Sequence, residues 1–201
     1  MFEKLKEQWG QLGYDVYFAQ KANECKDIIR TLIPKRESIS LGGSVTLDQL
    51  DIVSMFRDEG FNLLDRYAEM SDLDRTECFK KGLTADWLVT SANAITENGE
   101  IINVDGNGNR VAPLNYGTQN VLIVIGKNKI VADIPSGLER VRRIAPLNAK
   151  RLKRATPCVV DGVCHNCNSP ERICNMTSII HNCYRFPKRI KIILVNEELG
   201  Y

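Results

Sequence analysis

The stretch Ser38-Ile39-Ser40-Leu41-Gly42-Gly43-Ser44-Val45-Thr46 decides the fold class of this chain. A short β-rich pattern ends at Leu41 and is followed at once by two glycines and two hydroxyl residues. Residues 45–59 then carry apolar side chains at helical spacing, and residues 61–65 have the composition of another strand. This strand–helix–strand order predicts an α/β fold with a mainly parallel sheet flanked by helices, in which ligands bind at the carboxyl ends of the strands.

The alternation of strands and helices continues on both sides of this unit. Helices are expected over residues 2–12, 21–33, 71–81 and 135–144, and strands over residues 15–19, 86–90, 100–104, 121–125 and 191–195. A length of 201 residues fits one structural domain. Within it we distinguish an N-terminal helical segment, residues 1–34, from an α/β domain, residues 35–201.

The composition is that of an ordinary globular protein, with 43% hydrophobic and 26% charged residues. No apolar run approaches the ~20 residues that a membrane-spanning helix needs. The amphipathic start of the chain lacks the apolar core of a signal peptide. We therefore expect a cytoplasmic protein without a membrane span.

The net charge of +2 conceals an uneven distribution. Residues 1–139 hold 15 basic and 21 acidic side chains, whereas residues 140–201 hold 12 basic and 4 acidic ones. The basic excess begins in residues 140–154, which contain seven Lys or Arg residues and no acid. This run could bind nucleic acid or an anionic ligand. No aromatic residues alternate with the basic ones, so we favour a solvated helix face over a nucleic-acid surface.

The glycine loop is the first candidate site. Gly42 and Gly43 let the main chain approach a ligand closely, and the hydroxyls of Ser44 and Thr46, with the amides that begin the next helix, suit an anionic oxygen. The alternative is that Ser44 or Thr46 only caps that helix. The pattern matches neither the Walker loop nor the GxGxxG fingerprint, so both interpretations stay open.

A second candidate site lies in residues 90–110, a stretch rich in small and polar side chains. Loops of this kind line pockets and orient substrates. Glu97 or Asp105 could serve here as a nucleophile or general base. An arginine in this stretch could hold a carboxylate or phosphate through two hydrogen bonds. The candidate ligand-binding residues are Asn103, Asn109 and Arg110. The alternative is turn formation, which is sufficient to explain the Asn-Gly pair at 98–99.

Five of the seven cysteines fall within 26 residues near the end of the sequence. Their order is Cys158-x5-Cys164-x2-Cys167-x6-Cys174-x8-Cys183, with His165 and His181 nearby. In a chain without an export signal, such clustering favours a metal site over disulfides. The C-x2-C pair can hold one ion with two thiolates. The expected metal ligands are Cys158, Cys164, Cys167 and Cys174.

The identity of the metal stays open at this point. A [4Fe–4S] cluster is slightly preferred because the segment has a loop-like composition with a proline, and zinc is the alternative. Free or redox-active thiols are a third interpretation. The remaining cysteines, Cys25 and Cys78, lie alone in helix-like segments and are expected to be small buried hydrophobes.

Four blocks of this sequence resemble the LUD domain, also termed DUF162, in the order in which that family has them. They are residues 41–47 (LGGSVTL), residues 85–86 with 90–96, residues 103–112 (NVDGNGNRVA) and residues 124–131 (VIGKNKIV). The family includes lactate-utilization protein C and the LUD portion of protein B. The cysteine-rich segment differs from the typical protein C and from the twin-ferredoxin end of protein B, and resembles a subset of short LUD proteins.

The resemblance implies a fold similar to the ribose-5-phosphate isomerase, glucosamine-6-phosphate deaminase and coenzyme A transferase group. The Gly-Gly-Ser loop would then lie where those proteins bind phosphate or acyl groups. The resemblance also implies a link to the oxidation of lactate to pyruvate, which lactate-utilization proteins carry out as a multiprotein iron–sulfur system. The different cysteine segment leaves the transfer of that role open. A homodimer is compatible with this fold group.

Two functions of different classes are therefore expected. The first is an enzyme or redox-complex subunit of organic-acid metabolism that binds a small anionic metabolite at residues 42–46 and 103–110. The metabolite would be a carboxylate, a phosphate or an acyl-CoA, and electrons would pass through a cluster held by the cysteine segment. The second is a metabolite-sensing or scaffold module whose cysteines hold a structural zinc ion.

Overall fold

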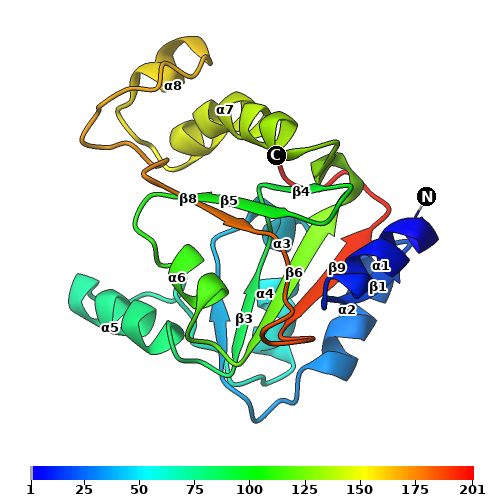
Figure 1. The fold of residues 1–201 in the computed structure, drawn as a ribbon. Coiled ribbons are helices and arrows are strands. Elements are labelled where there is room, and N and C mark those ends of the chain that lie inside the picture. Colours follow the sequence, from blue (N-terminus) through cyan, green and yellow to red (C-terminus); the bar gives the residue numbers. More distant parts are fainter. Residues whose placement is uncertain (1) are drawn as a thin grey trace.

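The computed structural model describes residues 2–201, which form two sheets with helices around them (Figure 1). The larger sheet is parallel throughout and has the order β1-β9-β6-β3-β2. Its strands are β1 (Asp15–Ala19), β2 (Ile39–Leu41), β3 (Trp87–Thr90), β6 (Asn120–Gly126) and β9 (Ile190–Val195). The predicted α/β fold with a mainly parallel sheet is confirmed.

The central strand β6 shows why the sheet forms where it does. Val121–Ile125 are all apolar and fully buried, as expected for a strand that is covered on both faces. Leu122 and Val124 belong to a core that α2 and α4 complete, whereas Ile123 and Ile125 belong to a second core that includes α1. The alternation of side chains along the strand therefore separates two hydrophobic cores, one on each face of the sheet.

The helices surround this sheet. They are α1 (Phe2–Gln11), α2 (Ala22–Leu32), α3 (Val45–Gln49), α4 (Ile52–Asp58), α5 (Asp72–Gly82), α6 (Val111–Asn115), α7 (Ile134–Arg151) and α8 (Pro157–Asp161), with a 3₁₀ turn, η1, at Lys127–Lys129. The predicted helices over residues 2–12, 21–33 and 71–81 correspond to α1, α2 and α5 and are confirmed. In the described residues, no helix has the length and apolarity needed to cross a bilayer.

A smaller sheet of four strands has the order β7-β4-β5-β8. Its strands are β4 (Ala94–Thr96), β5 (Ile101–Asp105), β7 (Ile130–Val131) and β8 (Met176–Ile180). In Figure 1 it crosses between the arrowheads of the larger sheet and α7. The strand predicted over residues 100–104 is present, but it pairs antiparallel with β4 and β8 in this second sheet, which the strand–helix alternation did not predict.

The prediction of one continuous helix over residues 45–59 was wrong. The helix is divided into α3 and α4, because Asp51 lies between them in the left-handed conformation with φ of 51°. The strand predicted over residues 61–65 was also wrong. It is reduced to a single bridge between Leu63 and Ile39, after which the chain turns away.

The last long helix, α7, extends well past the predicted end at Ile144 and reaches Arg151. Pro146 lies inside it, although a proline removes one helical hydrogen bond. The carbonyl group that loses its partner belongs to Arg142, which is exposed, so water can satisfy it. The additional turn matters for the site because it carries Asn148 and Arg151 to a cavity.

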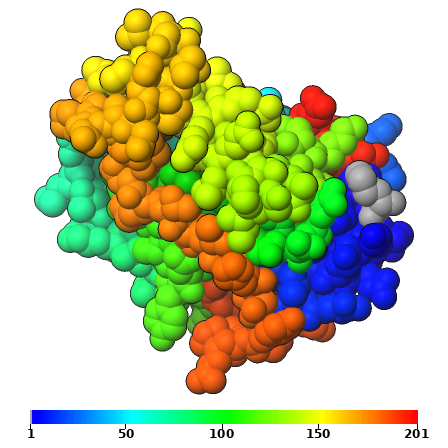
Figure 2. Space-filling view, turned by 45° about the horizontal axis from the view of Figure 1, so that its top comes forward, coloured from blue at the N-terminus to red at the C-terminus, as the bar shows by residue number. Residues whose placement is uncertain are grey.

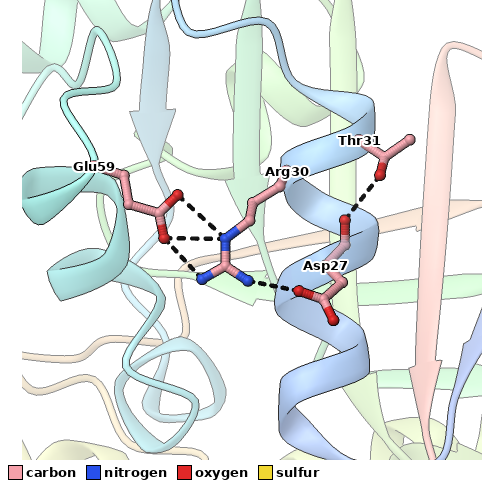
Figure 3. A network of polar contacts seen from close by, with 4 residues as sticks. All are labelled: Asp27, Arg30, Thr31 and Glu59. Carbon is pink, nitrogen blue, oxygen red and sulfur yellow. Dashed lines mark hydrogen bonds and ion pairs between the residues drawn. The ribbon is translucent and has the colours of Figure 1, made fainter.

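An ion-pair network joins α2 to the end of α4 on the surface of the molecule (Figure 3). The Arg30 guanidinium donates to both carboxylate oxygens of Glu59 at 2.7–3.1 Å and to Asp27 at 2.7 Å. Thr31 donates its hydroxyl to the main-chain oxygen of Asp27 at 3.0 Å. The hydrogen bonds from Arg30 hold the pKa of the Glu59 carboxyl below its usual value.

Candidate functional site

Three loops meet where β2, β3 and β6 end. These strands are neighbours in the parallel sheet, so their carboxyl ends lie side by side. Thr46 follows β2 in the first turn of α3, Ser91 directly follows β3, and Lys129 follows β6 in η1. All three residues are buried. The sheet therefore brings together three polar side chains that are far apart in the sequence, at the place where α/β proteins bind ligands.

Lys129 is the central residue of this group and is only 5% exposed. Its Nζ donates to Thr46 Oγ1 at 2.8 Å and to Ser91 Oγ at 2.9 Å. None of the salt bridges among residues 2–201 involves it. Burial, aided by the positive charges of Arg140 and Arg110, lowers the pKa of Lys129 from 10.5 to about 7.

Ser91 and Lys129 line a cavity of about 410 Å³, a size typical of small-molecule sites. Gly43 and Ser44 of the glycine loop, the residues around Asp105, the inner face of α7 and residues 170–175 of the cysteine segment form the other walls. The basic residues of the lining are Arg66, Arg110, Lys129, Arg151, Arg154 and Arg172, and the acidic ones are Asp105 and Glu171. The cavity is therefore strongly positive and suited to an anion.

Arg110 is held mainly by the protein itself. Its Nη1 donates to Asn103 Oδ1 at 2.9 Å and to the main-chain oxygen of Ser91 at 3.2 Å. Its Nη2 donates to Asn93 Oδ1 at 3.0 Å and to the main-chain oxygen of Val104 at 2.7 Å. Burial lowers the pKa of Arg110. This residue therefore organises the wall of the cavity, and its guanidinium contributes positive charge rather than a free pair of donors.

Asp105 also has local partners. Its carboxylate accepts hydrogen bonds from the main-chain amides of Arg110 and Val111 at 3.0 and 3.1 Å, which fixes the start of α6. It lines the cavity together with Asn109. Glu97, the other residue predicted to be a nucleophile or base, is exposed after β4 and does not line the cavity. The structure therefore places Asp105 at the site and Glu97 away from it.

The glycine loop divides into structural and cavity-facing positions. A Cβ atom on Gly42 would lie 2.2 Å from Thr90 Oγ1, whereas one on Gly43 would have no neighbour closer than 3.8 Å. Ser44 accepts a hydrogen bond from the amide of Leu47 at 3.4 Å and so caps α3, and it also lines the cavity. The capping and the site interpretations of Ser44 are therefore compatible.

Asn103 is fully buried in β5 behind the cavity wall. Its Oδ1 accepts from Arg110, and within residues 2–201 its Nδ2 has no hydrogen-bond partner. Its observed contact is therefore with the arginine that shapes the wall.

The basic residues of the run 140–154 lie in different environments. Arg140 is buried and donates to the main-chain oxygens of Asn93, Asn128 and Tyr201 at 2.5–3.1 Å. Arg151 and Arg154 line the cavity. Part of the run therefore faces the candidate site rather than forming one continuous solvated face.

The cysteine segment lies against the same cavity. Residues 155–175, with α8, stand out at one edge of the molecule, in yellow and orange in Figure 2. A small hollow of about 20 Å³ is lined by Cys158, Cys164, Cys167 and Cys174, together with His165. Arg172 and Cys174 line both this hollow and the larger cavity. The two spaces therefore share a wall.

The four thiols around this hollow fit a metal or cluster in their number and chemistry. Arg172 Nε donates to Cys174 Sγ at 3.1 Å, and the Thr156 hydroxyl lies 3.2 Å from Cys158 Sγ. Within residues 2–201, no three His, Cys, Asp or Glu side chains are close enough together to hold a metal as they stand. Binding would therefore require the side chains to turn further toward the hollow.

The remaining cysteines and histidines lie elsewhere. Cys183 is buried and its Sγ donates to the main-chain oxygen of Phe186 at 2.9 Å. Cys25 is fully buried, as predicted, and burial raises its pKa to about 12. Cys78 is only half-buried. His165 is paired with Asp161 at 2.7 Å, and His181 is exposed.

Comparison with known proteins agrees with this architecture. The family model of the LUD domain matches residues 2–195. The chain belongs to the LUD domain family. A crystal structure of a DUF162 family protein from Deinococcus radiodurans has the same fold, with a TM-score of 0.56 and 16% sequence identity over 97% of this chain and 96% of that one. Among curated proteins, none matches.

The sequence alone does not single out the two residues at the centre of this candidate site, Ser91 and Lys129. Lys129 lies within one of the family blocks, but the segment 126–129 contains two lysines and no sequence pattern shows which one is buried. Ser91 lies within the second candidate stretch, where no sequence pattern distinguishes it from the other small polar residues. The signal for both is their position one to three residues after an apolar strand of a parallel sheet.

Proposed function

We propose that this LUD protein binds a small anionic metabolite in its 410 Å³ cavity and acts on it as an enzyme or redox-complex subunit of organic-acid metabolism. The observation that carries the proposal is the charge of the lining, where five arginines face two acidic side chains. A carboxylate, a phosphate or the acyl end of an acyl-CoA supplies the missing negative charge.

The position of the arginines supports binding at a defined place. Arg151 and Arg154 approach from the end of α7 and Arg172 from the cysteine segment, while Ser91 and Lys129 lie at the ends of the sheet strands. An anion between these groups would contact the sheet, the helix and the cysteine segment together. Its binding would therefore link the segment that carries the cysteines to the sheet and to α7.

Titration calorimetry with phosphate, L-lactate and acetyl-CoA tests the anion site. Wild-type protein should bind at least one of them, and Arg154→Gln should weaken that binding by about tenfold, the loss expected for one charge-assisted hydrogen bond. The matched control is Arg142→Gln, which removes an exposed arginine of α7 that does not line the cavity. Equal affinities for both variants would contradict the proposal, as would the absence of binding by any of the three anions.

The redox half of the proposal places a [4Fe–4S] cluster on Cys158, Cys164, Cys167 and Cys174. Such a cluster would accept or donate single electrons beside the anion, since Cys174 lies in the wall that the two spaces share. Electrons would then pass to other subunits of a redox complex. Arg172 donates a hydrogen bond to Cys174 Sγ and would thereby change the reduction potential of such a cluster.

The second candidate function, a sensing or scaffold module with structural zinc, is favoured by the size of the hollow. Its volume of about 20 Å³ has room for a single ion, whereas a four-iron cluster would need the segment to open further. In this case the metal would stabilise residues 155–175, and an anion in the cavity would be sensed through the order of that segment.

Metal analysis of anaerobically purified protein separates these candidates. The redox proposal expects about four iron and four sulfide per chain with a brown colour, and Cys164→Ser should lose them while Cys78→Ser keeps them. The zinc proposal expects one zinc per chain and a lower thermal midpoint after chelation. Protein that contains no metal, even after reconstitution under reducing conditions, contradicts both.

A further inference from the structure

The contact between Ser91 and Lys129 has a chemistry of its own beyond anion binding. Ser91 Oγ and Lys129 Nζ are 2.9 Å apart, and both residues line the cavity. A serine hydroxyl becomes a nucleophile when a neighbouring base takes its proton, and a desolvated lysine can be that base. Ser91 directly follows β3 and Lys129 follows the adjacent strand β6 in η1, and both residues are buried, which restrains their side chains.

We propose that Ser91 and Lys129 form a nucleophile–base pair that hydrolyses or transfers the acyl group of a small acidic ester or thioester. The inference rests on the anion cavity proposed above and adds the reaction class and the residues that perform it. The acidic end of the substrate would lie among Arg151, Arg154 and Arg172, and its acyl carbon would lie at Ser91, all of which line the same cavity.

Thr46 completes the arrangement as a positioning residue. Its Oγ1 accepts from Lys129 Nζ at 2.8 Å and lies 3.4 Å from Ser91 Oγ. Thr46 itself is fully buried and is fixed by the main-chain oxygen of Leu199 at 3.4 Å. A base that is oriented by a third group is the recurrent pattern of activated hydroxyl nucleophiles. Thr46 therefore restrains the lysine so that its nitrogen stays beside Ser91.

The protonation state of Lys129 suits the role of a base. The charged groups that act on it are Arg140 of α7 and Arg110 ahead of α6, both cationic, and both disfavour its proton. Burial acts in the same direction and is the larger effect. Of the two carboxylates that line the cavity, Asp105 accepts hydrogen bonds from the amides of Arg110 and Val111, and neither Asp105 nor Glu171 is among the groups that shift the pKa of Lys129. A substantial fraction of Lys129 is therefore neutral near neutral pH.

The reaction balances with water as the only co-reactant. Ser91 Oγ bonds to the acyl carbon while its proton moves to neutral Lys129 Nζ. The tetrahedral adduct then expels the alcohol or thiol, which takes that proton, and leaves an acyl ester on Ser91. Water attacks this ester, Lys129 takes a proton from the water, and the carboxylic acid departs as Ser91 regains its proton. In transfer, a second alcohol or thiol replaces water.

Mono-p-nitrophenyl succinate tests this chemistry, since it joins an acidic end to an ester with a coloured leaving group. Wild-type protein should release p-nitrophenolate, and quenched samples should carry a succinyl group on the peptide that contains Ser91. Ser91→Ala should abolish the label, and Lys129→Met should slow release by about a hundredfold or more, the usual contribution of a general base. Ser54→Ala and Lys127→Met, which change exposed residues, are the matched controls.

The pH profile separates a base from a merely structural lysine. The rate should rise with pH through about 7 in the wild type, as the proton leaves Lys129. Thr46→Val should move the midpoint of this rise, and Thr46→Ser should restore it. Thermal unfolding of each variant checks that it is folded. If Ser91→Ala were unfolded, label on any residue other than Ser91 in the wild type would overturn the proposal.

Calorimetry on the wild type keeps this proposal distinct from the anion site. Protein that binds succinate but never becomes acylated on Ser91 contradicts the nucleophile–base pair and leaves the anion site intact. Protein that neither binds succinate nor the three anions above contradicts both. Acylation at an equal rate in wild type and Lys129→Met contradicts the role of the base.

Discussion

The amino group of Lys129 lies in a buried site, where it contacts two hydroxyls and where the charges of two arginines disfavour its protonated form. The folded protein therefore holds a proton on this residue less tightly than the unfolded chain does. Between pH 7 and 10.5 the unfolded chain binds the proton that the folded chain has released, so folding stability rises with pH across this window. Below pH 7 Lys129 is protonated in both the folded and the unfolded state, and its burial then lowers the free energy of unfolding by the full amount.

Lys129→Met should remove this pH dependence. Relative to the wild type, the variant should gain on the order of 3 kcal/mol more unfolding free energy at pH 6.5 than at pH 9.5, since each pKa unit corresponds to about 1.4 kcal/mol. Urea unfolding at the two pH values measures the difference, and exposed Lys127→Met is the control. The same difference for both variants would show that Lys129 is not desolvated as described.

Gly42 and Gly43 should respond differently to alanine. Gly42→Ala would press a methyl group onto the buried, branched side chain of Thr90 and should cost about 1–3 kcal/mol of unfolding free energy. Gly43→Ala meets nothing closer than 3.8 Å and should leave stability within about 0.5 kcal/mol. Denaturant unfolding of the pair checks this, and a reversed order would contradict the account of the loop.

At the residue scale, the sequence predicts which stretches of the chain line the cavity more reliably than it predicts which individual residues do so. Gly43, Ser44, Asp105 and Asn109 line the cavity, as the two candidate stretches indicated. Composition cannot show that Gly42 is required by Thr90 rather than by a ligand, because the contact joins two neighbouring strands. It also cannot distinguish the buried Lys129 from the exposed Lys127.

At the scale of elements, the parallel strands followed from apolar runs, and the departures have local causes. Asp51 in the left-handed conformation divides the helix after the glycine loop. Pro146 indicates a helix end by its chemistry, but the residue whose carbonyl loses its partner, Arg142, is exposed, and α7 continues to Arg151. The strands β4 and β7 have three and two residues, too short for a periodic pattern.

The ion pair between Arg30 of α2 and Glu59 at the end of α4 should contribute little to stability, and its contribution should decrease with salt. Glu59→Gln removes the ion pair with Arg30 and should lower the thermal midpoint slightly, with a smaller effect at high salt because exposed charges are screened. The pKa of Glu59 is lowered in the folded state, so the pair stabilises above the ordinary pKa of a glutamate and is lost as the pH falls below it. Glu7→Gln, which changes an exposed residue of α1, is the control in the melting experiment. A large effect that is independent of salt would contradict this view.

At the scale of the whole molecule, the smaller sheet and α7 enclose a cavity at the carboxyl end of the parallel sheet. The smaller sheet lies beyond the carboxyl ends of β3 and β6, and α7 packs on its strands β4 and β5 (Figure 1). The cysteine segment returns from α8 to form β8, and so brings Arg172 and Cys174 to the cavity wall. From the sequence alone, the glycine loop and the cysteine segment are predicted as separate sites, because only the tertiary structure brings them to the same cavity.

The most direct test of the account is a crystal structure of the protein grown with the anion that binds most tightly in the calorimetric titration. The anion should lie in the 410 Å³ cavity, within hydrogen-bonding distance of at least one of Arg151, Arg154 and Arg172 and close to Ser91. An anion bound at any other place on the protein, with this cavity filled by water alone, would contradict the central claim.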